Sequence, residues 1–135
     1  MFKKIDHIGI AVTSLEAATE KYRLLVGKEP AHQELVEAQK VKTSFWELGE
    51  SRLELLEGTE PASPISKFVE KRGAGVHHIC FEVEDIAAAK EAFTTAGLQF
   101  IDLASDKGAH GAKVAFLHPK STGGVLFELV EYPKK

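Results

Sequence analysis

The sequence has few features of a disulfide-stabilised or membrane-spanning protein. It contains one cysteine, Cys80, among its 135 residues, so no disulfide can form within the chain. This cysteine usage fits a reducing compartment, and we expect a cytoplasmic protein. No apolar run approaches the roughly 18 residues that a membrane-spanning helix needs, so we expect no membrane association.

Concentrated positive charge is also lacking. The net charge is −3, and lysines and acidic residues are interspersed along the chain. A nucleic-acid-binding protein needs a basic stripe, so we expect no nucleic-acid partner. Residues 1–9 are typical of the start of a strand rather than of a signal sequence. At 135 residues the chain has the length of one domain, and we expect a single domain spanning residues 1–135.

Two stretches of the sequence are similar to each other at a spacing of 71 residues. Residues 5–12, IDHIGIAV, align with residues 76–83, VHHICFEV, so that His7 falls on His78. The alignment continues into the next segments, where apolar residues recur at spacings of three and four. This periodicity is typical of an amphipathic helix. The sequence therefore indicates an internal duplication.

Each half of the duplication has the pattern β-α-β-β-β, because three strand-like runs follow each helix. These runs are expected at residues 29–36, 40–48 and 51–58 in the first half, and at residues 98–103, 113–119 and 124–132 in the second. Residues 63–73 indicate a linker helix with Ser63 as N-cap and Pro64 at its first position. We predict an α+β fold in which two tandem modules, about 4–58 and 75–132, form one curved, cup-shaped mixed sheet with helices outside.

The histidines of the two repeated strands are expected to differ in orientation. Successive side chains of a strand point to opposite faces, so His7 points away from Ile8 and Ile10, which are expected to pack against helices. The repeat predicts the same inward orientation for His78. His77 is therefore expected on the helix side or at the strand margin.

Two glutamates are expected on the same concave face as His7 and His78. Glu54 and Glu128 each lie within an apolar run, and an unpaired buried charge is costly, so both must point away from their apolar neighbours or be paired. A single strand histidine or glutamate usually has a structural or solvated role. Four such residues without a shared role would not be expected to occupy matching positions of one repeat. Imidazoles and carboxylates suit a divalent ion such as Co, Ni, Mn, Zn or Fe, and we predict a metal centre.

These modules and their His/Glu/His/Glu pattern resemble the vicinal oxygen chelate superfamily, which includes glyoxalases, extradiol dioxygenases and bleomycin-type resistance proteins. The blocks at residues 63–83 and 116–135 are more specifically similar to the methylmalonyl-CoA epimerases, and the likeness spans nearly the whole chain. The resemblance implies an isomerase that interconverts (R)- and (S)-methylmalonyl-CoA, a divalent metal cofactor such as cobalt, and a homodimer. It implies that the metal ligands are His7, Glu54, His78 and Glu128.

The resemblance also implies two proton-transfer groups, of which it identifies one. Glu128, a ligand with a second carboxylate oxygen, is expected to serve one face of the substrate. Some epimerases have a glutamate at the position of Thr43, and threonine is not a base at neutral pH. Glu47 follows four residues later on the same strand face and is the candidate second base. A solvated surface role for Glu47 remains open, as do Glu37 or a water molecule as the base.

An acyl-CoA substrate carries phosphate charges, so we expect local cations near its binding site. The turn at residues 118–125 offers Lys120 and Ser121 beside backbone N–H groups, with Lys107 and Lys113 as alternatives. Two other functions remain open at this stage. One is a glyoxalase-type lyase with a glutathione-type substrate, and the other is a metal-free protein that binds a small molecule.

Overall fold

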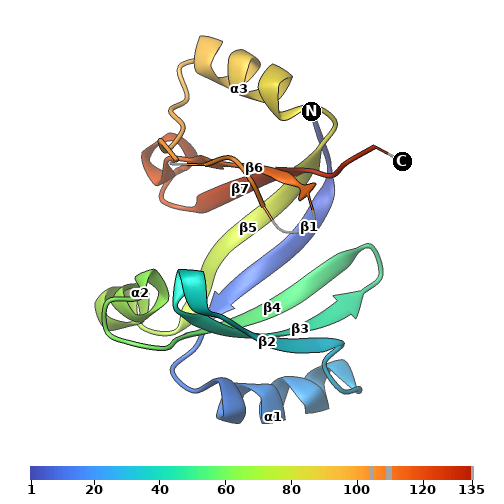
Figure 1. Ribbon diagram of the computed structural model, residues 1–135, viewed down its shortest axis with the longest axis vertical. Helices are drawn as coiled ribbons and strands as arrows, with labels where there is room; N and C mark the ends of the chain where they lie inside the picture. Colours follow the sequence, from blue (N-terminus) through green and yellow to red (C-terminus); the bar gives the residue numbers. More distant parts are fainter. Residues whose placement is uncertain (104, 109–110, 135) are drawn as a thin grey trace. The chain divides into compact units, whose positions relative to one another are not determined.

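The computed structural model describes every residue except 104, 109–110 and 135. The chain divides into two compact units, which we call the N-terminal unit (residues 7–77) and the C-terminal unit (residues 1–6 and 78–135). Two long strands, β1 (Phe2–Ala11) and β5 (Gly75–Val83), contribute residues to both units (Figure 1). Within the described residues, no helix is long and apolar enough to cross a membrane.

The N-terminal unit contains a sheet with the strand order β2-β3-β4-β1. Its β1 and β4 strands are parallel, and the other neighbouring pairs are antiparallel. The strands agree with the predicted runs. Besides the shared strands, the elements of this unit are α1 (Leu15–Val26), β2 (His32–Val36), a 3-10 turn (Glu37–Gln39), β3 (Val41–Leu48), β4 (Ser51–Gly58) and α2 (Pro64–Arg72).

Helix α1 covers one face of this sheet (Figure 1). It begins where the Ser14 hydroxyl accepts a hydrogen bond from the Ala17 N–H, and it ends at Gly27, whose φ of 85° is in the left-handed region. Its apolar stripe packs against a core in which Trp46 is fully buried. The core facing α1 consists of Ile10, Val12, Leu15, Ala18, Tyr22, Val26, Trp46 and Leu55.

Helix α2 covers part of the opposite face. Leu55 packs with the α1 core, whereas Leu56 packs with Ile65 and Phe68 of α2, as strand alternation requires. The predicted start and end of this helix are confirmed, with Ser63 as N-cap. The ring of His77 lies edge-on to Phe68 of α2 with 4.9 Å between centroids.

The C-terminal unit contains strands in the order β5-β7-β6, with β5 and β7 parallel and β6 and β7 antiparallel. Its core packs α3 against one face of these strands and includes Val83, Ala115 and Leu129. The alternation of β5 thus places Phe81 and Val83 on the helix side, as predicted. The further elements are α3 (Ile86–Thr95), β6 (Lys113–Leu117), a 3-10 turn (Pro119–Thr122) and β7 (Leu126–Glu131).

A carboxylate at the end of each unit's last strand holds the start of a helix. Glu57 of β4 accepts a hydrogen bond from the Leu15 N–H at 2.6 Å, and Glu131 of β7 accepts one from the Ile86 N–H at 2.9 Å. A helix N-terminus has unpaired N–H groups and favours negative charge. The two contacts occupy equivalent positions in the repeat, and so they support the internal duplication at the level of hydrogen bonding.

The predicted strand at residues 98–103 is wrong. In its place the structure has one isolated bridge between Phe100 and Leu117, with a hydrogen bond from the Ile101 N–H to the Phe116 carbonyl. The Gln99 N–H donates to the Ser121 hydroxyl at 2.9 Å. Because the Gln99 N–H donates to the Ser121 side chain, it cannot donate to the backbone of β6. The backbone pairing therefore stays limited to one bridge and is too short to form a strand.

Replacing Gly58 with alanine is expected to destabilise the N-terminal unit. Gly58 ends β4 directly beneath the start of α2, and an added Cβ would lie 2.8 Å from the backbone nitrogen of Ser66. Backbone cannot rotate away as a side chain can, so we expect a loss of about 1–3 kcal/mol of unfolding free energy. Gly75→Ala is the matched control, because its Cβ would meet nothing within 4 Å. Denaturant unfolding of both variants checks this, and equal stability would contradict it.

Candidate metal centre

The N-terminal unit brings His7 and Glu54 together. In the parallel pair of β1 and β4, His7 is in register with Arg52 and Gly9 with Glu54, so the two candidate ligands are diagonal neighbours. Their ligand atoms lie within 4.8 Å of each other. Both residues alternate onto the sheet face opposite α1, since Ile10 and Leu55 pack against that helix.

The C-terminal unit brings His78 and Glu128 together in the same way. The His78 Nε2 lies 3.5 Å from the Glu128 Oε1, and the two side chains are only 10% and 14% exposed. Cys80 is the register partner of Glu128 and is fully buried beside Ala112 and Val130. Cys80 is therefore a small buried side chain beside a candidate ligand.

Each candidate carboxylate also has a phenylalanine beside it on the next strand. Phe45 is in register with Glu54 across β3 and β4, and Phe116 is in register with Glu128 across β6 and β7. Directly opposite residues of an antiparallel pair point to the same face, so each ring flanks its carboxylate. The sequence analysis missed these two residues, although they also obey the spacing of 71 between the halves.

The residues present fit a divalent metal ion. Two ligand atoms that are each about 2.1 Å from an ion lie about 3 Å apart in octahedral geometry and about 3.4 Å apart in tetrahedral geometry. The separation of 3.5 Å between His78 and Glu128 requires little adjustment to reach these values. Each unit therefore holds one pair of an imidazole and a carboxylate that can share an ion.

The structure places the second candidate base on the same sheet face as His7 and Glu54. Glu47 is exposed and is in register with Arg52 on β4. Thr43 lies four residues before Glu47 on β3 and is 5% exposed. Its hydroxyl has no hydrogen-bond partner among the described residues. Glu37 lies in the 3-10 turn that precedes β3.

Arg52 is a residue of this face that the sequence analysis missed. Its Nη2 lies 3.4 Å from the His7 Nδ1, and its guanidinium lies 5.6 Å from the centroid of the Phe45 ring. Arginine has only donors, so this contact uses the lone pair of the His7 Nδ1 and would have to be released when His7 binds a metal ion. The pattern of alternating residues in SRLELLEG carried a usable signal, because it puts Arg52 on the same side as Glu54.

The candidate residues for coenzyme A lie in the turn between β6 and β7. Lys120 is exposed, and its backbone N–H donates to the His118 Nδ1 at 3.1 Å. The Ser121 hydroxyl oxygen accepts a hydrogen bond from the Gln99 N–H. A hydroxyl that accepts one hydrogen bond can still donate another, so the position of Ser121 is compatible with a second partner.

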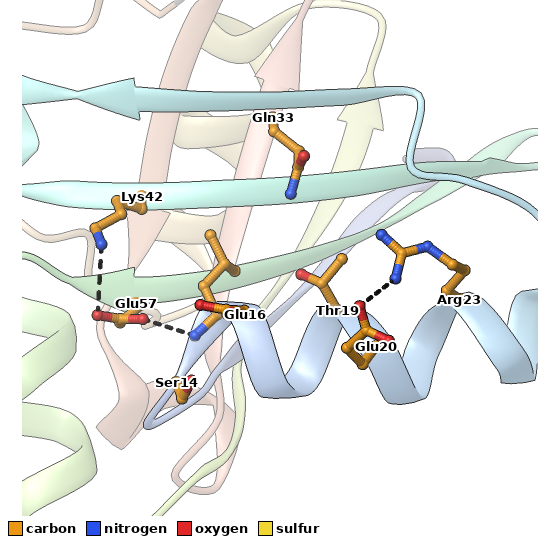
Figure 2. A pocket seen from close by; sticks show the side chains of 9 residues that line it. Ser14, Glu16, Thr19, Glu20, Arg23, Gln33, Lys42 and Glu57 are labelled. Carbon is orange, nitrogen blue, oxygen red and sulfur yellow. Dashed lines mark hydrogen bonds and ion pairs between the residues drawn. The ribbon is translucent and has the colours of Figure 1, made fainter.

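A cavity of about 350 Å³ lies on the other face of the N-terminal unit, between α1 and strands β2, β3 and β4. Figure 2 shows the side chains that line it. Four of its five charged side chains form two ion pairs: Glu57 contacts Lys42 at 4.0 Å, and Arg23 contacts Glu20 at 2.7 Å. None of the candidate ligands lines it. The lining residues are Ser14, Leu15, Glu16, Thr19, Glu20, Arg23, Gln33, Lys42 and Glu57.

Comparison with known proteins gives consistent results. Residues 6–116 match the family described as the Glyoxalase/Bleomycin resistance protein/Dioxygenase superfamily. The ethylmalonyl-CoA/methylmalonyl-CoA epimerase of Cereibacter sphaeroides is 42% identical over 131 residues, which cover 96% of this chain and 98% of that protein.

Solved structures are similar over nearly the whole chain. A hypothetical protein from Bacillus halodurans C-125 is 43% identical, with a TM-score of 0.89 over 98% of this chain and 96% of that chain. A variant of the Streptomyces coelicolor methylmalonyl-CoA epimerase, in complex with 2-nitronate-propionyl-CoA, is 38% identical with a TM-score of 0.86 and the same coverage. These likenesses confirm the predicted α+β fold class and the superfamily resemblance.

Proposed function

The chain belongs to the glyoxalase/bleomycin resistance protein/dioxygenase superfamily, and on that premise we propose that it is an isomerase that interconverts (R)- and (S)-methylmalonyl-CoA. The similarity to epimerases of Cereibacter sphaeroides and Streptomyces coelicolor supports this assignment. The observation that carries it within this chain is the presence of one histidine and glutamate pair in each unit, at equivalent positions of the repeat.

We propose that the two pairs together hold one divalent ion, with His7, Glu54, His78 and Glu128 as ligands. The mixture of imidazole and carboxylate donors suits Co, Ni, Mn, Zn or Fe, and metal availability selects among them. When bound, such an ion neutralises the substrate carboxylate and stabilises negative charge on the thioester oxygen.

The side chains of this protein would then move the proton. The proton on C2 lies between a thioester and a carboxylate, and epimerisation removes it from one face and returns it to the other. We propose Glu128 as the base for one face, held in orientation by its contact with His78. Glu47 is the proposed base for the other face, supported by its position on the same sheet face as Glu54.

The remainder of the substrate requires a binding surface outside this centre. Lys120 is exposed in the turn after β6 and can approach a phosphate, and Ser121 can donate its hydroxyl proton there. We therefore propose this turn as part of the coenzyme A site. We also propose that the protein forms a homodimer and is located in the cytoplasm.

A direct assay separates the proposed function from its two alternatives. The purified protein is expected to convert either pure C2 epimer of methylmalonyl-CoA to the same nearly equimolar mixture, as followed by chromatography that resolves the two epimers. It is expected to leave the glutathione hemithioacetal of methylglyoxal unchanged. Turnover of that hemithioacetal without epimerisation would favour a glyoxalase-type lyase. Tight binding of small molecules with no turnover of either compound would favour a binding protein.

A further inference from the structure

Phe116 lies on the same sheet face as the candidate ligands of the C-terminal unit. Ala115 packs in the core beneath α3, and Leu117 alternates onto the same side, so Phe116 points to the opposite face of β6. Leu129 of β7 also packs in that core, which places Glu128 on the face of Phe116. Phe116 and Glu128 are directly opposite each other on the two strands, so the ring lies beside the carboxylate.

The Phe116 ring is not used in the packing of this unit as the other phenylalanine rings are. Among the described residues, Phe116 has no aromatic partner, and it belongs to neither apolar cluster of the C-terminal unit. It is only partly buried, so some of its apolar surface is open beside Glu128. The phenylalanines of this unit that form stacked or edge-to-face pairs are Phe2, Phe81, Phe93, Phe100 and Phe127.

The proposed chemistry brings the alkyl group of the substrate to this side. C2 of methylmalonyl-CoA carries the thioester, the carboxylate, a proton and a methyl group. The thioester oxygen and the carboxylate are the groups expected at the ion, so the proton and the methyl group lie on opposite sides of the plane that contains these two groups. Glu128 removes the proton from one side, and in the other epimer the methyl group occupies that side. Because epimerisation interconverts the two epimers, every turnover places the alkyl group beside Glu128 once.

We propose that Phe116 contacts the C2 alkyl group of the substrate and limits its size. This inference rests on the proposed function and specifies the substrate class of the same centre, which is malonyl-CoA thioesters with a short alkyl group at C2. The carbonyl of Phe116 accepts a hydrogen bond from the Ile101 N–H at 2.8 Å, which helps to fix the strand that carries the ring. A longer alkyl chain would have to displace the ring or move C2 away from Glu128.

Two substrates that differ by two methylene groups test the assignment. The value of kcat/KM is measured for methylmalonyl-CoA and for propylmalonyl-CoA with the metal-loaded protein, and the wild type is expected to prefer methylmalonyl-CoA. Phe116→Ala is expected to shift the ratio of the two values toward propylmalonyl-CoA by about 10- to 100-fold, since each methylene group in an apolar pocket changes discrimination about tenfold or more. Phe116→Leu keeps a smaller apolar side chain, so a smaller shift in the same direction is expected.

Phe100→Ala is the matched control. Phe100 is also a partly buried phenylalanine of the C-terminal unit, but its ring stacks on Phe93 of α3 with 6.4 Å between centroids. Its replacement removes the same side chain from the face that α3 covers. The variant should lose stability and keep the wild-type ratio of the two kcat/KM values.

The outcomes distinguish failure of this inference from failure of the proposed function. A wild-type ratio in a folded and active Phe116→Ala protein would overturn the assignment. If circular dichroism shows that this variant does not fold, the ratio for Phe116→Leu decides in the same way. A folded Phe116→Leu protein that is inactive with both substrates would also overturn it, because a limit on alkyl size does not explain that loss. A wild-type protein that epimerises neither substrate would instead refute the proposed function, and the inference with it.

Discussion

Replacing His78 with alanine is expected to remove both the bound metal ion and the epimerase activity. The substitution deletes one of four proposed ligands and leaves the Glu128 carboxylate without its imidazole neighbour at 3.5 Å. His7→Ala is expected to have the same effect through the pair with Glu54. Without the ion, the developing negative charge loses several kcal/mol of stabilisation. Elemental analysis of the purified variants, together with the epimerase assay, measures both effects.

His77→Ala is the control for these two variants. The imidazole of His77 packs against Phe68 of α2, so its loss should cost stability without changing metal content. A His77→Ala protein that loses the ion while His78→Ala keeps it would contradict the assignment of faces. A register shift of one residue exchanges the two faces of a strand, and that result would require such a shift.

Glu128→Gln is expected to separate metal binding from proton transfer. Glutamine keeps the size and one oxygen donor but lacks charge and basicity, so weak metal binding should persist while epimerisation falls by about 100- to 10,000-fold. A base that serves one face should fail with one C2 epimer more severely than with the other. Deuterium incorporation at C2 is therefore measured from each epimer separately, alongside metal content.

Glu84→Gln provides a comparison on an exposed carboxylate of the same unit, which pairs with Lys3 at 3.1 Å. It should behave as wild type with both epimers. Near-normal exchange from both epimers by metal-loaded Glu128→Gln would exclude Glu128 as a base and leave it a ligand only. Glu47 would then be the first residue to test in its place.

Much of the fold could be predicted because the duplication makes two weak patterns support each other. The alignment of His7 with His78 also aligns the strands and helices that follow, and the helix start at Ser63 has a recognisable cap. The pairing of each histidine with a glutamate could be inferred for the same reason. Alternation in a strand fixes which face a side chain occupies, and one repeat applied to four residues leaves few choices.

The remaining features depend on contacts between residues that are distant in the sequence. The Gln99 N–H is taken by the Ser121 hydroxyl, which shortens a predicted strand to a bridge and cannot be read from the local pattern. The local sequence around Glu57 and Glu131 is typical of solvated strand residues. Their hydrogen bonds to the first N–H groups of α1 and α3 are seen only in the folded structure. Arg52 likewise gains its significance only from its register with His7.

Proton exchange at C2 of methylmalonyl-CoA in deuterated buffer, with and without added cobalt, tests the central claim most directly. The protein freed of metal by chelation is expected to exchange the proton at the uncatalysed rate, and cobalt should restore rapid exchange from both C2 epimers. Rapid exchange by the metal-free protein would contradict the proposed role of the ion. No exchange by a protein that has bound cobalt and acyl-CoA would contradict the assignment as an epimerase.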